Sequence, residues 1–111
     1  MWKDIKITNV SGIDKLNSEF EVWMVALLPY AKMKIRVYEQ QNGYFFGITS
    51  VQLKRKFDGD FESAIGHGST ADEALEDTIR YFNEMVEDDY PDLDELGLKE
   101  DEIQYVDWSE F

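Results

Sequence analysis

The clearest hydrophobic pattern in the chain is a strict alternation over residues 32–38, which predicts a half-buried strand. The apolar positions, all expected on one face, are Met33, Ile35 and Val37. The Asn42-Gly43 pair follows and favours a two-residue hairpin loop, because both positions tolerate a positive φ. A turn centred there places Val37 opposite Ile48. The apolar residues of the second strand, Tyr44, Phe46 and Ile48, are therefore predicted to share the apolar face of the first strand.

The alternation changes phase after Ile48, where the next apolar residues are Val51 and Leu53. One extra residue near Ser50 would produce this change, which predicts a β-bulge. Asp58-Gly59 marks a second tight turn, and residues 61–65 supply a third strand. Across this second hairpin, Arg55 is expected to pair with Glu62.

A long amphipathic helix is predicted from Thr70 to about Asp88, before Pro91. Thr70 and Glu73 have the spacing of a capping box, in which each side chain satisfies a backbone N–H of the first turn. An apolar stripe at helical spacing follows, comprising Ala71, Leu75, Ile79, Phe82 and Val86.

The segment before the first strand allows two interpretations. Apolar residues spaced by three and four between Ile13 and Leu28 favour a helix that ends at Pro29. The alternative is a strand from Phe20 to Leu28, because that stretch is densely apolar. A short strand is also expected within residues 1–10.

Together these elements predict an α+β fold with a three-stranded antiparallel sheet packed on helices in α-β-β-β-α order. The whole chain, 1–111, is expected to be a single domain with its core over about 13–88. Residues 89–111 form an acidic C-terminal extension rich in large apolar groups. We expect this extension to dock onto the core in part, or to present aromatic anchors to a partner.

Composition supports a folded protein, since 43% of residues are hydrophobic and 14% are aromatic. Cysteine is absent, which excludes disulfides and thiolate chemistry. The longest apolar run, residues 22–28, is far shorter than the roughly 20 residues that span a membrane. No secretory signal is visible, and a cytoplasmic location without membrane attachment is expected.

Charge divides the chain into two unlike halves. Residues 1–57 hold nine Lys and Arg against five Asp and Glu, whereas residues 58–111 hold two against 19, and the total is −13. The second half would repel phosphate backbones, so direct nucleic-acid binding is not expected. A basic protein partner would be attracted, with an affinity that falls as salt rises.

The strings GYFFGITSV and GHGSTADEALEDTIRYF resemble the core of HicB-like antitoxin domains. The residues that carry this resemblance are Gly43, Tyr44, Gly66, Gly68, Thr70, Glu73, Ala74 and Leu75. The resemblance implies a strand–hairpin–strand–helix unit similar to an incomplete double-stranded-RNA-binding domain. RNA-binding members of that fold place lysines at the start of the last helix, where this chain has Asp72, Glu73, Glu76 and Asp77, so RNA binding is not carried over.

Catalytic chemistry finds little support. His67 is the single histidine, and a base without a placed partner is not a catalytic site. We therefore expect a non-enzymatic protein with no metal, no cofactor and no catalytic residue, although an enzyme that uses His67 remains a rival hypothesis.

The leading hypothesis is an inhibitor, of the kind made by phages or mobile elements, that binds a basic nuclease or nucleic-acid-binding protein by charge mimicry. The predicted contacts are Asp72, Glu73, Glu76, Asp77, Glu84, Glu87, Asp88 and Asp89, with Trp108 and Phe111 as anchors. The alternative is a HicB-like antitoxin or orphan relative that covers a small ribonuclease toxin. A structural phage protein is a further alternative, and a homodimer is left open.

Overall fold

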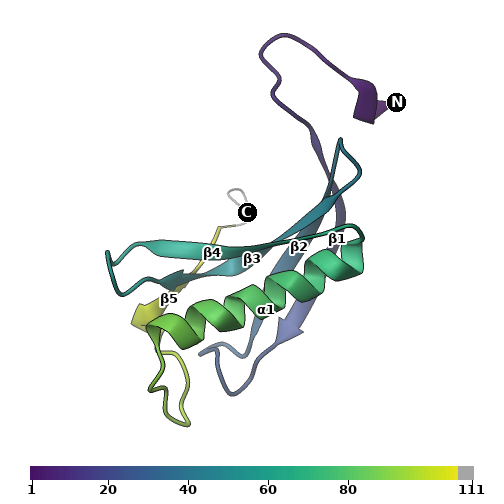
Figure 1. Ribbon diagram of the computed structural model, residues 1–111. Coiled ribbons are helices and arrows are strands. Elements are labelled where there is room, and N and C mark those ends of the chain that lie inside the picture. The colour runs from purple at the N-terminus through teal and green to yellow at the C-terminus, as the bar shows by residue number, and fades with distance from the viewer. Residues whose placement is uncertain (108–111) are drawn as a thin grey trace.

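The computed structural model describes residues 1–107, which form an antiparallel sheet with one long α-helix lying across one of its faces (Figure 1). The strands are β1 (Asp14–Trp23), β2 (Lys32–Gln40), β3 (Phe45–Lys54), β4 (Phe61–Gly68) and β5 (Ile103–Tyr105). The helix is α1 (Ala71–Asp89), and the short 3-10 helices are η1 (Trp2–Asp4) and η2 (Glu100–Glu102). The first four strands lie in sequence order, and β5 pairs with β3.

This order corrects the predicted α-β-β-β-α fold, because the segment predicted as the first helix is a strand. Asp14 to Trp23 pairs with the whole length of β2, and Phe20 lies opposite Ile35 on the core face. The alternate residues Glu19 and Glu21 lie on the other face, opposite Arg36 and Lys34. The helical spacing of apolar residues was misleading because Trp23 is 62% exposed and contributes to no core.

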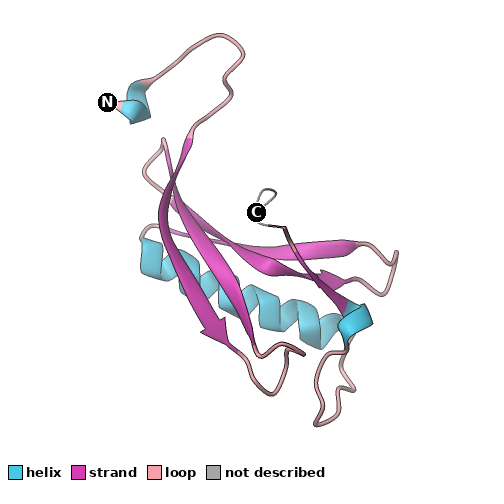
Figure 2. Ribbon diagram, turned by 180° about the vertical axis from the view of Figure 1, so that it is seen from behind, coloured by secondary structure: helices cyan, strands magenta, loops and turns pink. Residues whose placement is uncertain are grey.

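The short strand expected within residues 1–10 is also wrong. This stretch forms η1 and an irregular segment that projects beyond the loop between β2 and β3 (Figure 2). None of its side chains is buried. Gln41 in the hairpin loop holds it by donating from Nε2 to the carbonyls of Trp2 and Ile5, at 3.0 and 3.1 Å.

The hairpin between β2 and β3 has a loop one residue longer than predicted. Val37 lies opposite Gly47, and Ile48 lies opposite Arg36, so the predicted pairing of Val37 with Ile48 is wrong. The loop is Gln41-Asn42-Gly43, with Gly43 at φ 87°, the geometry that glycine allows in three-residue hairpins. Shifting the register by one residue moves the side chains of Phe46 and Ile48 to the opposite face, whereas Val51 and Leu53 further along β3 are buried in the core. Phe46 and Ile48 therefore point away from the helix.

The pairing of β3 with β4 shifts near the predicted bulge, but by two residues rather than one. Between the pairs Ile48–Ile65 and Gln52–Ser63, β3 has three residues and β4 has only Ala64. The Thr49 hydroxyl fills the gap in the ladder: it accepts from the Ala64 N–H at 3.0 Å and donates to the Val51 carbonyl at 2.7 Å. The predicted cross-hairpin pair is also present, with Arg55 Nη1 3.1 Å from Glu62 Oε2.

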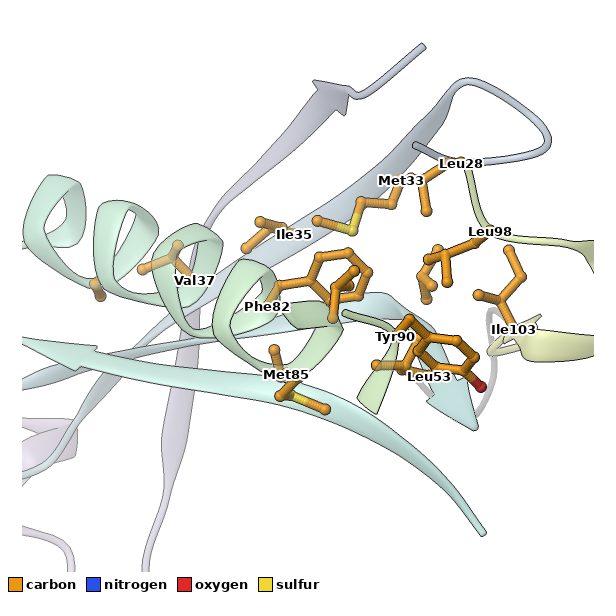
Figure 3. Close-up of a cluster of buried hydrophobic side chains, with 14 residues drawn as sticks. Leu28, Met33, Ile35, Val37, Leu53, Phe82, Met85, Tyr90, Leu98 and Ile103 are labelled. Atoms are coloured by element: carbon orange, nitrogen blue, oxygen red, sulfur yellow. The ribbon is translucent and has the colours of Figure 1, made fainter. Parts of the chain in front are cut away.

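A later part of the C-terminal extension belongs to the sheet. β5 pairs with Val51, Gln52 and Leu53 of β3. Leu98 and Ile103 are buried with the core residues of β2, β3 and α1, and Figure 3 shows these side chains converging around Phe82. The hydrophobic core therefore extends beyond residue 88 and includes part of the acidic segment.

Helix α1 packs unusually close to the sheet because the strands beneath it carry glycines. A Cβ added to Gly66 would lie 2.3 Å from the Thr78 backbone nitrogen, and one added to Gly68 would lie 2.6 Å from the Ala74 nitrogen. A Cβ on Gly47 would lie 2.3 Å from the Thr78 hydroxyl. We call these three residues the glycine floor; the helix backbone and the side chain of Thr78 fill the space that larger residues would occupy.

Replacing Gly66 with alanine should therefore destabilise the protein severely. The new methyl group would collide with the backbone of α1, and overpacking of this kind costs about 1–3 kcal/mol or more. Urea unfolding followed by circular dichroism measures the loss.

The matched control is Gly12→Ala, since an added Cβ there meets nothing within 4 Å. Equal stability of the two variants would contradict the tight packing of α1 on the sheet.

Candidate partner-binding surface

The outer face of α1 carries seven carboxylates. At 3.6 residues per turn, they fall on the side of the helix opposite the buried Ala74, Thr78 and Phe82. They are Asp72, Glu73, Glu76, Asp77, Glu84, Glu87 and Asp88. We call this set the acidic face. Thr70 caps the helix by accepting from the Glu73 N–H at 3.1 Å, as predicted.

Two of the seven carboxylates also fasten the start of the helix. Glu73 Oε2 accepts from the Ser69 hydroxyl at 2.5 Å and from the Ser69 N–H at 2.9 Å. These bonds hold the pKa of Glu73 below its usual value, with the hydroxyl as the largest cause. Asp77 Oδ2 accepts from the His67 N–H at 2.8 Å, which ties the helix to the edge strand β4.

Arg80 is the single base of α1 and lies within the acidic face. It pairs with Glu76 at 2.8 Å and reaches Asp77 at 4.0 Å. All three side chains are about half exposed or more, so these pairs contribute little stability and leave a net negative surface.

The other four members of the acidic face are Asp72, Glu84, Glu87 and Asp88. All four are exposed, and within residues 1–107 none of them takes part in a salt bridge. Glu84 and Asp88 are four residues apart, a spacing at which like charges destabilise a helix by roughly 0.2–0.5 kcal/mol. Their charge is available to a partner.

Asp89, also predicted as a contact, has a different position. Its side chain is only 12% exposed and forms a salt bridge with Arg55 Nε. The same guanidinium reaches Glu62, so Arg55 joins the end of α1 to the β3–β4 hairpin. The structure therefore gives Asp89 a role in holding the helix rather than in presenting charge.

The two predicted aromatic anchors, Trp108 and Phe111, lie outside the described residues. An aromatic group that the prediction missed lies on α1 itself. Tyr81 is 39% exposed and borders the acidic face next to Asp77 and Asp88 on the helix surface. Tyr81 lies four residues after Asp77 and seven residues before Asp88, a helical spacing that was visible in the sequence.

The basic residues of β2 are matched to acids of the neighbouring strand β1. Lys32 Nζ lies 3.1 Å from Glu21, and Lys34 and Arg36 lie 3.4 and 2.9 Å from Glu19. Pairing between neighbouring strands thus compensates the charge of β2. No such compensation acts on the acidic face beyond Arg80 in the part of the chain that the structure describes.

The face of the sheet opposite α1, which we call the open face, carries several apolar groups, and two of them, Phe46 and Ile48, were predicted to lie on the core face. Tyr38 and Phe46 stack there with ring centroids 5.1 Å apart, and Ile48 lies opposite Ile65. The signal that could have revealed this is the small Gly47 between Phe46 and Ile48, since a glycine suits the face against which a helix packs closely.

Other site chemistries find no support in the described residues. His67 is exposed, and its backbone N–H donates to Asp77. Over residues 1–107, no three acidic or histidine side chains gather closely enough to hold a metal ion. None of the described helices is both long and apolar enough to cross a membrane.

Comparisons with protein-family models, curated proteins and solved structures found no match. The resemblance to HicB-like antitoxin domains therefore stays a prediction, and the function must be inferred from the surface itself.

Glu73 gives a pH-dependent prediction. Because its folded-state pKa is lowered, its ionised form adds stability above the unfolded value of about 4.5, and this increment disappears as the pH falls through the folded pKa. Glu73→Gln should therefore be less stable than the wild type at pH 7, with the difference shrinking toward pH 3. Thermal unfolding across this range measures it.

Glu84→Gln serves as the control, because Glu84 has the same charge on the same face but no bonded partner among the described residues. A stability gap for Glu73→Gln that stayed constant from pH 7 to pH 3 would contradict the assigned role of Glu73.

Proposed function

We propose that this protein is a non-enzymatic inhibitor that binds the positively charged surface of a nucleic-acid-binding protein, such as a nuclease, through the acidic face of α1. The observation that carries the proposal is the alignment of seven carboxylates with one arginine along the exposed side of a single helix. A basic groove that accepts phosphates offers the complementary potential.

The helix gives these charges a fixed arrangement. From Asp72 to Asp88 the acidic face runs for roughly 24 Å at 1.5 Å per residue. The glycine floor and the Arg55–Asp89 salt bridge hold α1 against the sheet along this length. A partner therefore meets a preorganised row of carboxylates, which lowers the entropic cost of binding.

The charge distribution also orients the encounter. The acids and bases of β1 and β2 pair with one another, so the net negative charge of the protein lies on α1 and on the segment that follows it. Such a field steers a basic partner toward the helix and raises the association rate, an effect that salt screens within about 10 Å at 0.1 M. Tyr81 at the border of the acidic face supplies an aromatic contact of the kind that contributes affinity.

Removing charge from the acidic face should weaken binding while leaving the fold intact. The variant Asp72→Asn, Glu84→Gln, Glu87→Gln and Asp88→Asn keeps side-chain size and spares Glu73 and Asp77, which fasten the helix. At about 0.5–1 kcal/mol per lost charge, the affinity should fall by roughly 30-fold to 1,000-fold. Capture from a native-host lysate at low salt, followed by titration of the retained protein, measures it.

The matched control removes four charges elsewhere: Asp14→Asn, Asp92→Asn, Glu95→Gln and Asp101→Asn, all exposed positions. It has the same net charge as the test variant and should retain the partner nearly as well. Equal loss in both variants would show that only total charge matters, and capture that does not weaken with salt would refute the electrostatic mechanism.

A further inference from the structure

The open face of the sheet carries a contiguous apolar patch formed by Tyr38, Phe46, Ile48 and Ile65. These residues come from β2, β3 and β4, and they are cross-strand neighbours: Tyr38 pairs with Phe46, and Ile48 pairs with Ile65. Ile65 is 44% exposed, and Tyr44 at the adjoining end of the hairpin is 58% exposed. Both α1 and its core contacts lie on the other side of the sheet (Figures 1 and 2).

The neighbouring part of the open face is close to neutral. Glu19 and Glu21 of β1 lie beside Lys32, Lys34 and Arg36 of β2 and form salt bridges with them. An apolar patch next to a row of matched charges is typical of protein–protein interfaces rather than of a solvated surface.

We propose that the open face binds a second copy of this chain, so that two sheets pack face to face in a symmetric dimer. The charge of −13 restricts how two copies can meet, because any contact that brings the α1 helices together opposes two acidic faces. Contact through the open faces places the helices on the outside. Since packed layers are about 10 Å apart, the helices would be separated by roughly 30 Å, about three Debye lengths.

The area of the open face suits this partner. Four strands about 4.8 Å apart and roughly 30 Å long cover on the order of 600 Å². Two such faces bury about 1,200 Å² in total, the lower end of the range for specific stable interfaces. A symmetric contact also pairs the apolar patch of one copy with that of the other, as a two-fold axis requires.

This inference goes beyond the proposed inhibition, because it concerns the opposite side of the sheet. A dimer of this form would present two acidic faces pointing in opposite directions, each able to bind a basic partner. Dimerisation and partner binding should also respond to salt in opposite directions. Salt screens the repulsion between two acidic chains and should strengthen dimerisation, whereas it should weaken binding of a basic partner.

The test is sedimentation equilibrium of the full chain and two variants of Ile65, at low and high salt. The wild type should dimerise, more strongly at high salt. Ile65→Asp and Ile65→Lys should each weaken dimerisation by at least about 100-fold, since both bury an unpaired charge in each half of the interface. Because the two variants change the net charge in opposite directions, an equal effect identifies the interface rather than the total charge.

Tyr81→Asp is the matched control, with a similarly exposed side chain, 39%, on the acidic face. It should dimerise nearly as well as the wild type, and circular dichroism should show all variants folded. A wild type that stays monomeric at both salt concentrations would overturn the inference. So would a dimer that both Ile65 variants leave intact, or one that Tyr81→Asp weakens equally. None of these results bears on partner capture by the acidic face.

Discussion

The close approach of α1 to the glycine floor is the constraint on which the rest of the structure depends. Gly66 and Gly68 bring the helix backbone within reach of the strand backbone, so the helix cannot rotate without a collision. That fixed rotation buries Thr78 and Phe82 and turns seven carboxylates outward. It also assigns the two faces of the sheet, because the face with the glycines accepts the helix and leaves the other face uncovered by α1.

The two sides of the molecule differ in how they treat charge. On the open face, acids of β1 lie beside bases of β2 and neutralise them. On α1, acids accumulate with one arginine among them, at a cost to helix stability that packing must offset. Keeping acids on α1 apart from bases on the sheet needs a rigid scaffold. Arg55 contributes to that rigidity because it ties Asp89 at the end of the helix to the β3–β4 hairpin.

The sequence predicted the local elements with strong signals and failed where a single residue decided the outcome. The cap at Thr70, the stripe of α1 and the Arg55–Glu62 pair were all found. A register shift does lie near Ser50, but it contains two extra residues rather than the predicted one. The first strand was taken for a helix because its edge position lets Leu16 and Trp23 remain exposed, which gave the apolar residues a false helical spacing. What distinguishes the strand from a helix is its pairing with β2 over its full length.

The hairpin shows why part of the site could not be predicted. A loop of three residues instead of two reverses the faces of Phe46 and Ile48 in β3, and both loops suit the Asn-Gly pair. The error hid the open face by assigning Phe46 and Ile48 to the core. The acidic face was predicted in large part, since helical periodicity is readable from sequence. The inward position of Asp89 was not, because it depends on a tertiary contact with Arg55.

Charge mimicry is tested most directly by competition for the partner. A labelled nucleic acid bound to the protein captured from the host should be displaced as the purified chain is added, with a potency that falls as salt rises. Displacement should need a much higher concentration of the variant that lacks the charges of Asp72, Glu84, Glu87 and Asp88. A stable ternary complex of chain, captured protein and nucleic acid would contradict the proposal that the acidic face occupies the phosphate-binding surface.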